Sequence, residues 1–244
     1  MDYLKHQTPP ARILFFDIES TSLKSDFGFL LAIGYKFLGE KEPTVLSIGK
    51  FTAKNFRQKE KSLLLKFREV YLKADMTVTH NGKRFDIPFI NTKMLKHGLG
   101  VLPPLIAIDT LQIARFHLKT LSRKRLDTIS AYFNTTAEKS PVEGEIWVNA
   151  SVGDQEALAY IVSHCKADVE VLEEIYLKLR PLFLGHPRVS GYGPCRACGS
   201  LNLQRRGLAY SSVKGIQYQV YCKDCGAWER RPQRETGWME KAEN

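Results

Sequence analysis

The chain has 244 residues, enough for one generous domain or for one domain with a small appendage. Its 36 Lys and Arg against 26 Asp and Glu give a net charge of +10, which favours polyanionic partners, although solubility alone would also explain it. No apolar run is long enough to cross a bilayer, and residues 1–10 lack the apolar stretch of a signal peptide. We therefore expect an intracellular, cytoplasmic protein without a membrane partner.

The first part of the chain predicts a sheet. Residues 12–18 form a short run that is apolar on both faces, which is typical of a central buried strand. Residues 28–38 and 43–49 predict two more strands, and the turn-like segment between them indicates an antiparallel meander.

Helices then alternate with strands. The patterns predict strands over 76–80 and 105–109, and helices over 57–73, 85–97, 110–118, 124–133 and 154–183. This order predicts an α/β fold, a mixed sheet covered by helices. Three glycines and two prolines within 184–194 mark a linker, so we expect a domain over 1–184, a linker over 185–194 and a small module with a tail over 195–244.

Two carboxylates end the first predicted strand. Asp17 and Glu19 are two residues apart, so both side chains point to one face while Phe16 and Ile18 point into a core. Neighbouring carboxylates repel unless a cation compensates them, and magnesium prefers oxygen ligands. Taken alone, the pair would also fit a solvated strand end.

Two later segments carry further acidic candidates. Asp86 follows the Asn81-Gly82 turn at the start of a predicted helix, where a helix N-cap is an equal interpretation. His164 and Asp168 are four apart on the predicted helix over 154–183, so they share one helical face. A solvated helix face and a partly buried structural histidine are the alternatives.

Taken in order, the segments around Asp17 and Glu19, Asp86, and Asp168 resemble the three exonuclease motifs of the DEDD superfamily, which has a ribonuclease-H-like fold. Within that superfamily they are most similar to ribonuclease-H-like exonucleases akin to the proofreading domain of family B DNA polymerases. The segment 81–90 resembles the second motif of this group and 153–176 its third-motif helix, and 124–134 resembles the helix between them. The resemblance covers about residues 11–183.

This resemblance implies a two-metal-ion 3′-5′ exonuclease that hydrolyses phosphodiester bonds in nucleic acid. Asp17, Glu19 and Asp168 would bind two Mg²⁺ or Mn²⁺ ions, with Asp86 holding one ion directly or through water. The family places a Tyr four residues, or a His five residues, before the last Asp. Here His164 stands at the tyrosine spacing, and we expect it to orient the attacking water, with base function lost in mild acid.

Further candidates lie in or near these motifs. Leu23 and Phe85 would pack against the terminal base, or more simply in the core, and Asn81 would contact sugar or phosphate, or only form the turn. A basic segment would track the phosphate backbone, or form a solvated helical face; its members are Arg115, His117, Lys119, Arg123, Lys124 and Arg125.

Four of the five cysteines form two Cys-x-x-Cys pairs, each followed by Gly, on either side of a predicted hairpin. Cys195, Cys198, Cys222 and Cys225 resemble a zinc ribbon that holds one structural Zn²⁺, whereas disulfides are not expected inside a cell. Cys165 is expected to pack. Charge and stacking surfaces in this module suggest nucleic-acid binding, with protein docking as an alternative; they comprise Arg205, Arg206, Lys214, Lys223, Arg230, Arg231, Tyr210, Tyr218, Tyr221 and Trp228.

The function predicted from the sequence is therefore a 3′-5′ exonuclease acting on DNA, with single strands favoured and RNA left open. Two alternatives remain. One is a non-catalytic nucleic-acid-binding protein on a nuclease-like scaffold, and the other is a structure-specific endonuclease.

Overall fold

The computed structural model describes residues 11–136, 142–190 and 193–233. The chain divides into two compact units: a large unit, Arg12–Tyr176, and a small unit, Leu177–Asn244 together with Met1–Ala11. The predicted domain boundary after residue 184 remains a prediction. Parts of the predicted N-terminal segment (1–10), linker (191–192) and tail (234–244) lie outside the described residues.

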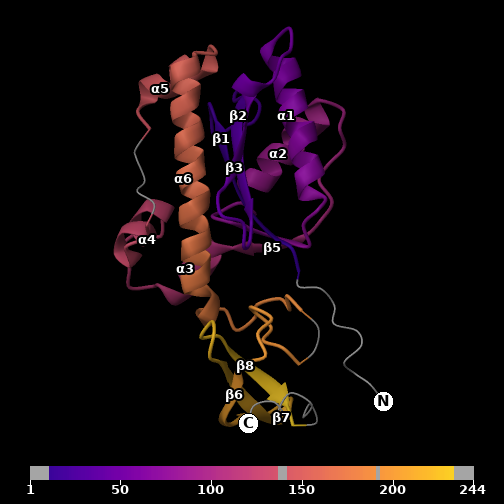
Figure 1. The fold of residues 1–244 in the computed structure, drawn as a ribbon, viewed down its shortest axis with the longest axis vertical. Coiled ribbons are helices and arrows are strands. Elements are labelled where there is room, and N and C mark those ends of the chain that lie inside the picture. The colour runs from indigo at the N-terminus through magenta and orange to yellow at the C-terminus, as the bar shows by residue number, and fades with distance from the viewer. Residues whose placement is uncertain (1–10, 137–141, 191–192, 234–244) are drawn as a thin grey trace. The chain divides into compact units, whose positions relative to one another are not determined.

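The large unit is built on a five-stranded mixed sheet in the order β3-β2-β1-β4-β5 (Figure 1). Strand β1 is central, as its two-sided apolar pattern predicted, and the predicted meander β1-β2-β3 is antiparallel. Strands β4 and β5 continue the sheet parallel to β1. The strands are β1 (Ile13–Ser20), β2 (Leu30–Phe37), β3 (Thr44–Ser47), β4 (Met76–Thr79) and β5 (Ile106–Asp109).

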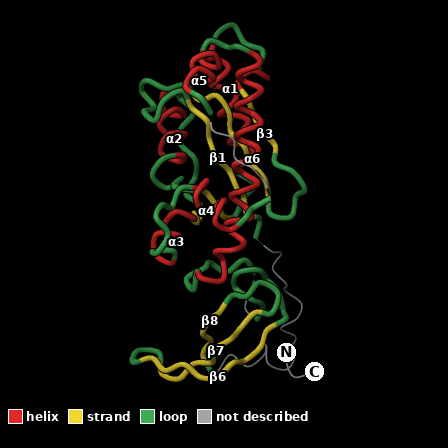
Figure 2. Tube along the Cα trace, turned by 90° about the vertical axis from the view of Figure 1, so that its left-hand side faces the viewer, coloured by secondary structure: helices red, strands yellow, loops and turns green. Residues whose placement is uncertain are grey.

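Helices cover both faces of this sheet, with α1 (Phe56–Tyr71) and α2 (Asp86–Lys96) on one side and α6 (Gln155–Leu179) on the other (Figures 1 and 2). Alternation along β1 sets the packing. The Phe16 ring lies 5.2 Å from the ring of Phe67 in α1, whereas the Phe15 ring lies 5.3 Å from that of Tyr176 in α6. Since Asp17 and Glu19 alternate in step with Phe15, their side chains face α6.

The remaining helices are α3 (Thr110–His117), α4 (Leu126–Phe133) and α5 (Gly144–Ser151), with 3-10 turns at Ile48–Lys50 and Arg180–Leu182. The sequence patterns predicted α3 and α4 but missed α5. Helix α6 ends before Pro181, where the prediction ran on to residue 183. Among the described helices, none has both the length and the apolarity needed to cross a bilayer.

The small unit contains a three-stranded antiparallel sheet of β6 (Leu203–Ser211), β7 (Gly215–Cys222) and β8 (Trp228–Pro232). The predicted hairpin forms, and Gly215 enters β7 with a φ of +65° that favours glycine. Its buried hydrophobic cluster is small and includes two of the cysteines: Cys195, Ala197, Leu203, Val220, Cys222 and Ala227. A unit with so little apolar core needs another source of stability.

Candidate metal centres

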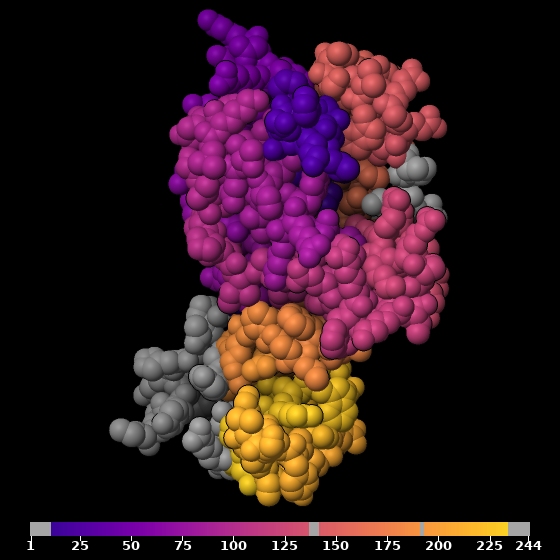
Figure 3. Space-filling view, turned by 180° about the vertical axis from the view of Figure 1, so that it is seen from behind, coloured from indigo at the N-terminus to yellow at the C-terminus, as the bar shows by residue number. Residues whose placement is uncertain are grey.

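An acidic cluster lies where the end of β1 meets α6. Possible ligand atoms of Glu19, His164 and Asp168 all lie within 4.8 Å of one another, and a carboxylate oxygen of Asp17 comes equally close to one of Glu19. His164 Nε2 is 3.6 Å from Asp168 Oδ2 and 3.8 Å from Glu19 Oε1. In the space-filling view, part of α6 is visible in a recess beside the indigo segment that follows β1 (Figure 3).

The donor set of this cluster fits divalent cations. Glu19 and Asp168 are only 7% and 5% exposed, and Asp17 is half-buried. Crowded carboxylates with so little water around them repel one another, and a divalent cation relieves that repulsion. The structure therefore brings three of the four acidic candidates together with His164.

Cys165 lies against the same carboxylates, but it has the properties of a packing residue. It is fully buried, and its thiol points to the backbone carbonyl of Asp17, with Sγ 3.9 Å from the oxygen. Burial, followed by the negative charges of Glu19, Asp17 and Asp168, raises the pKa of the Cys165 thiol well above its ordinary value. Because hard cations such as Mg²⁺ take oxygen ligands rather than sulfur, the buried Cys165 thiol is a poor ligand here.

Gly34 allows α6 to approach the sheet at this point, a role that sequence reasoning missed. It pairs with Asp17 across β1 and β2. A Cβ at this position would lie 2.8 Å from Cys165 Sγ and 2.9 Å from Val169 Cγ2. A glycine inside an otherwise apolar strand was the available signal for such a close approach.

We expect Gly34→Ala to push α6 away from β1, lowering the unfolding free energy by about 1–3 kcal/mol and separating His164 and Asp168 from Glu19. Urea denaturation and Mn²⁺ affinity measure the two effects. Gly144→Ala is the control, because a Cβ at Gly144 meets nothing within 4 Å. Equal behaviour of the two variants would contradict this role.

Asp86 is not among the residues whose ligand atoms lie within 4.8 Å of one another in the acidic cluster, and it is hydrogen-bonded to β1 instead. The Ile18 N–H, between Asp17 and Glu19, donates to Asp86 Oδ1 at 3.2 Å. Asp86 is not the N-cap of α2, because that position is Phe85 and its side chain makes no cap hydrogen bond. Burial, and to a lesser extent the charge of Asp109, raises the pKa of Asp86 to about 7.

Asp109 is a second acidic residue that the sequence reading did not single out. It ends β5, is 3% exposed, and accepts hydrogen bonds from the Asn81 and Leu111 N–H groups at 2.9 and 3.0 Å. It therefore caps α3 and fixes the Asn81 turn, where Asn81 has a φ of +74°. The turn interpretation of Asn81 is confirmed, and its contact with substrate remains a prediction.

The raised pKa of Asp86 gives the metal-free protein a defined pH dependence. The folded protein binds the carboxyl proton of Asp86 more tightly than the unfolded chain does. Protonation of Asp86 therefore stabilises the fold fully below about pH 4, and this stabilisation is lost as the pH rises through about 7. We expect Asp86→Asn to be more stable than wild type at about pH 8, by roughly 2–4 kcal/mol, with little difference at about pH 4. Urea denaturation with zinc present and Mg²⁺ and Mn²⁺ omitted measures this, and parallel pH profiles would contradict it.

A buried ionic network anchors the loop that follows Glu19. Lys93 Nζ donates to the Gly28 carbonyl and lies 3.2 Å from Glu60 Oε1, and His97 Nε2 lies 2.8 Å from Glu60 Oε2. The Leu30 N–H also donates to Glu60, at 2.9 Å. The network therefore holds the end of this loop at Gly28 and Leu30. Earlier in the loop, Leu23 and Phe27 are each 79% exposed.

The predicted core packing of Leu23 and Phe85 has a different outcome for each residue. Core packing is wrong for Leu23, because its side chain lies in solvent. Phe85 is half-buried, and its ring packs 5.6 Å from that of Phe89 against the core. Contact of either residue with a terminal base remains a prediction.

The basic segment is only partly helical. Helix α3 ends at His117, so the interpretation of the whole segment as one helical face is wrong. Lys124 Nζ donates to the Leu121 carbonyl at 2.5 Å, and Arg125 pairs with Asp127 at 3.2 Å. Most of its basic side chains are exposed, namely Arg115, His117, Lys119, Arg123 and Arg125.

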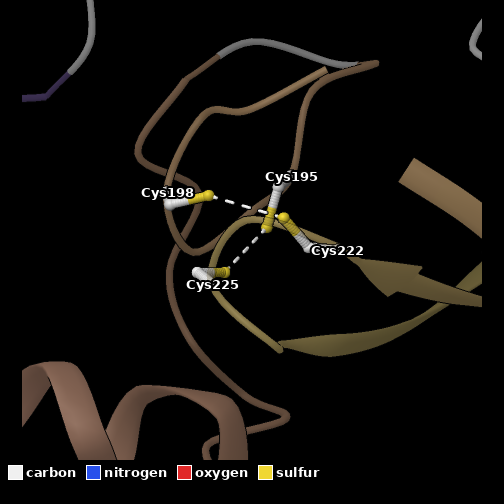
Figure 4. Close-up of side chains that lie close together, drawn as sticks. All are labelled: Cys195, Cys198, Cys222 and Cys225. Atoms are coloured by element: carbon white, nitrogen blue, oxygen red, sulfur yellow. Dashed lines mark hydrogen bonds between the residues drawn. The ribbon is translucent and has the colours of Figure 1, made fainter. Parts of the chain in front are cut away.

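The four paired cysteines converge on one point in the small unit, and their Sγ atoms lie within 4.8 Å of one another (Figure 4). The Cys195–Cys225 and Cys198–Cys222 Sγ distances are 3.8 and 3.7 Å, far longer than a disulfide bond. Thiolates bound tetrahedrally to one zinc ion would lie roughly 3.8 Å apart. The geometry therefore fits one tetrahedral metal site.

The glycine after each cysteine pair allows the backbone turn that follows the second cysteine. Gly199 and Gly226 have φ values of +78° and +72°. Their N–H groups donate back to the carbonyls of Cys195 and Cys222, each at 2.9 Å. Both turns have the same hydrogen-bonded form, which directs each pair of sulfur atoms inward.

Comparisons with known proteins bear on the family and fold of the large unit. A family model described as the RNase_H superfamily matches residues 14–180. The chain is 35% identical over 126 residues to the PolC-type DNA polymerase III of Pediococcus pentosaceus, covering 50% of this chain and 9% of that protein. It is 34% identical over 124 residues to the PolC-type polymerase of Ureaplasma parvum, covering 43% of this chain and 8% of that protein.

The chain thus spans less than a tenth of these curated relatives. A family B DNA polymerase from Pyrobaculum calidifontis has a similar fold, with a TM-score of 0.55 and 19% identity over 72% of this chain and 25% of that one. The mixed sheet, the helices on both of its faces and the match over 14–180 show that the chain belongs to the RNase_H superfamily.

Proposed function

We propose that the large unit is a divalent-cation-dependent 3′-5′ exonuclease that hydrolyses phosphodiester bonds of single-stranded DNA. The observation that supports this most is the meeting of Glu19 with His164 and Asp168 from a helix far along the chain. The PolC-type relatives are DNA polymerases by name, which favours DNA as the partner.

Asp17, Glu19 and Asp168 would hold the cations, and Asp86 would contact one of them directly or through water. Two divalent ions would stabilise negative charge on the attacking and leaving oxygens of an in-line displacement. The Asp86 carboxylate also accepts a hydrogen bond from the Ile18 N–H, which ties it to β1 between Asp17 and Glu19.

His164 has a role of its own in this proposal. Its Nε2 lies close to both Glu19 and Asp168, on the side of α6 that faces β1. A neutral imidazole there would accept a proton from the attacking water and orient it toward the phosphorus. Protonation in mild acid would remove this function and leave an imidazolium that competes with cations for the same carboxylates.

Competition between a protonated His164 and the metal ions also defines the alternative function. If the His164 imidazolium takes the place of the divalent cations beside the carboxylates, the large unit binds nucleic acid without cutting it. Single-stranded DNA and RNA, labelled at either end and incubated with Mg²⁺ or Mn²⁺, distinguish the two cases. We expect a ladder that shortens from the 3′ end, with circular single strands resistant. Cut circles would support an endonuclease, and binding without shortening in either metal would support the non-catalytic protein.

A further inference from the structure

The sheet of the small unit has two faces of different character. One faces the cysteine core, where Val220, Cys222 and Leu203 are buried. On this face Glu229 and Arg231 are buried as an ion pair, and Arg231 also donates to the carbonyls of Gly193 and Pro194 at 2.6 and 2.7 Å. Arg231 is therefore structural and is removed from the candidate nucleic-acid contacts.

The opposite face forms what we call the outer platform. Two of its cross-strand rows form the platform: Tyr221 pairs with Gln204 and Trp228, and Gln219 pairs with Gly207 and Arg230. All of these residues are half-buried or exposed. The third row on this face, in which Gln217 pairs with Ala209 and Pro232, is not part of the platform, because Ala209 and Gln217 are buried. With Arg206, the side chains of the outer platform are Gln204, Arg206, Gln219, Tyr221, Trp228 and Arg230.

A β-bulge separates the two neighbouring arginines of β6. The register shifts between Arg205 and Gly207, which leaves Arg206 without a cross-strand partner in the ladder. The Arg206 guanidinium lies 5.8 Å from the ring centre of Tyr221, whereas that of Arg205 lies 5.1 Å from Tyr218. Tyr218 and Tyr221 are three residues apart on one strand, so the arginines lie on opposite faces.

The outer platform combines stacking surface, positive charge and amide groups. Tyr221 and Trp228 form a ring pair with centres 5.1 Å apart, and Trp228 is 42% exposed. Arg206 and Arg230 flank the pair, and neither cross-strand row contains an acidic residue. Because Gly207 has no side chain, no group at that position of β6 projects from the sheet beside Gln219.

We propose that the outer platform binds single-stranded nucleic acid, with a base stacked on Trp228 and Tyr221 and phosphates held by Arg206 and Arg230. Stacking on an aromatic surface is open to any unpaired base, whereas bases inside a duplex are already stacked. Gln204 and Gln219 offer donors and acceptors to base edges. An acidic peptide would use the arginines but would leave the aromatic pair without a function. This platform does not depend on the nuclease activity of the large unit.

The test uses the full zinc-loaded chain without Mg²⁺ or Mn²⁺, so that binding is measured without cleavage. The probes are fluorescein-labelled oligothymidylate and oligouridylate of about fifteen nucleotides, followed by anisotropy. We expect Arg206→Gln and Trp228→Ala each to weaken binding about fivefold or more. Arg205→Gln and Tyr210→Ala are the matched controls on the other face, where Tyr210 is 74% exposed, and they should change affinity less than about twofold.

A second measurement needs no destabilising change. Oligothymidylate should quench tryptophan fluorescence in the wild type, and Trp228→Phe should remove most of that quenching while keeping one zinc per chain. The proposal would be overturned if variants on both faces lost affinity equally, or if Trp228→Ala bound with unchanged affinity. It would also be overturned if duplex DNA or polyglutamate bound as tightly as the single strands. A chain that binds through the platform but never cuts would contradict only the exonuclease, and one that cuts while Arg206→Gln and Trp228→Ala bind normally would contradict only the platform.

Discussion

Replacing Asp168 with Asn will lower the rate of phosphodiester hydrolysis by roughly a thousandfold or more, because it removes a negative ligand from a cluster that acts as a unit. Asp168 is 5% exposed and lies beside both Glu19 and His164, so the substitution removes a charge from within the cluster. Initial rates on 3′-end substrates at saturating Mn²⁺ measure the effect, which should be a loss of turnover.

Glu170→Gln is the control for this variant. Glu170 lies two residues further along α6 and therefore points away from Asp168. It removes the same charge from the same helix, so it should retain the wild-type rate within about twofold. If Glu170→Gln and Asp168→Asn lose activity to the same extent, the effect belongs to the charge or stability of α6, and the acidic cluster is not the site.

Replacing Cys222 with Ser will abolish zinc binding and unfold the sheet of the small unit. A structural zinc contributes on the order of 10 kcal/mol to the folding of such modules, whereas the apolar cluster here contains only small side chains, one leucine and one valine. We expect about one zinc per wild-type chain and none in the variant, with rapid proteolysis within Leu203–Pro232.

Cys165→Ala is the matched control, because Cys165 is the fifth cysteine and lies in the large unit. It should keep its zinc and resist proteolysis in β6, β7 and β8. Loss of zinc from Cys165→Ala, or a full complement of zinc in Cys222→Ser, would show that the metal is held elsewhere.

Periodicity predicted most of the fold, because its signals are local. The two-sided apolar run of 12–18 became the central strand, and the i, i+4 spacing of His164 and Asp168 brought both side chains toward Glu19. Each cysteine pair with its following glycine likewise encodes a turn whose geometry follows from a few consecutive residues.

Features that depend on distant partners were not visible in this way. Gly34 matters only because α6 packs on it, and Asp109 only because its carboxylate meets the Asn81 N–H. The network of Glu60, Lys93 and His97 joins α1, α2 and the turn after α2, which no single pattern links. Strand alternation alone places the neighbouring Arg205 and Arg206 on opposite faces, but the bulge that shifts the register between Arg205 and Gly207 leaves no signal in the sequence.

We propose that acidic side chains from distant segments of the chain form one site for divalent cations. Titrating zinc-loaded protein with Mn²⁺ and following free Mn²⁺ by electron paramagnetic resonance tests it directly. We predict that about two ions bind per wild-type chain, and that Asp17→Asn and Asp168→Asn each lose at least one of them. A folded, zinc-loaded wild type that leaves the free Mn²⁺ signal unchanged would contradict the claim.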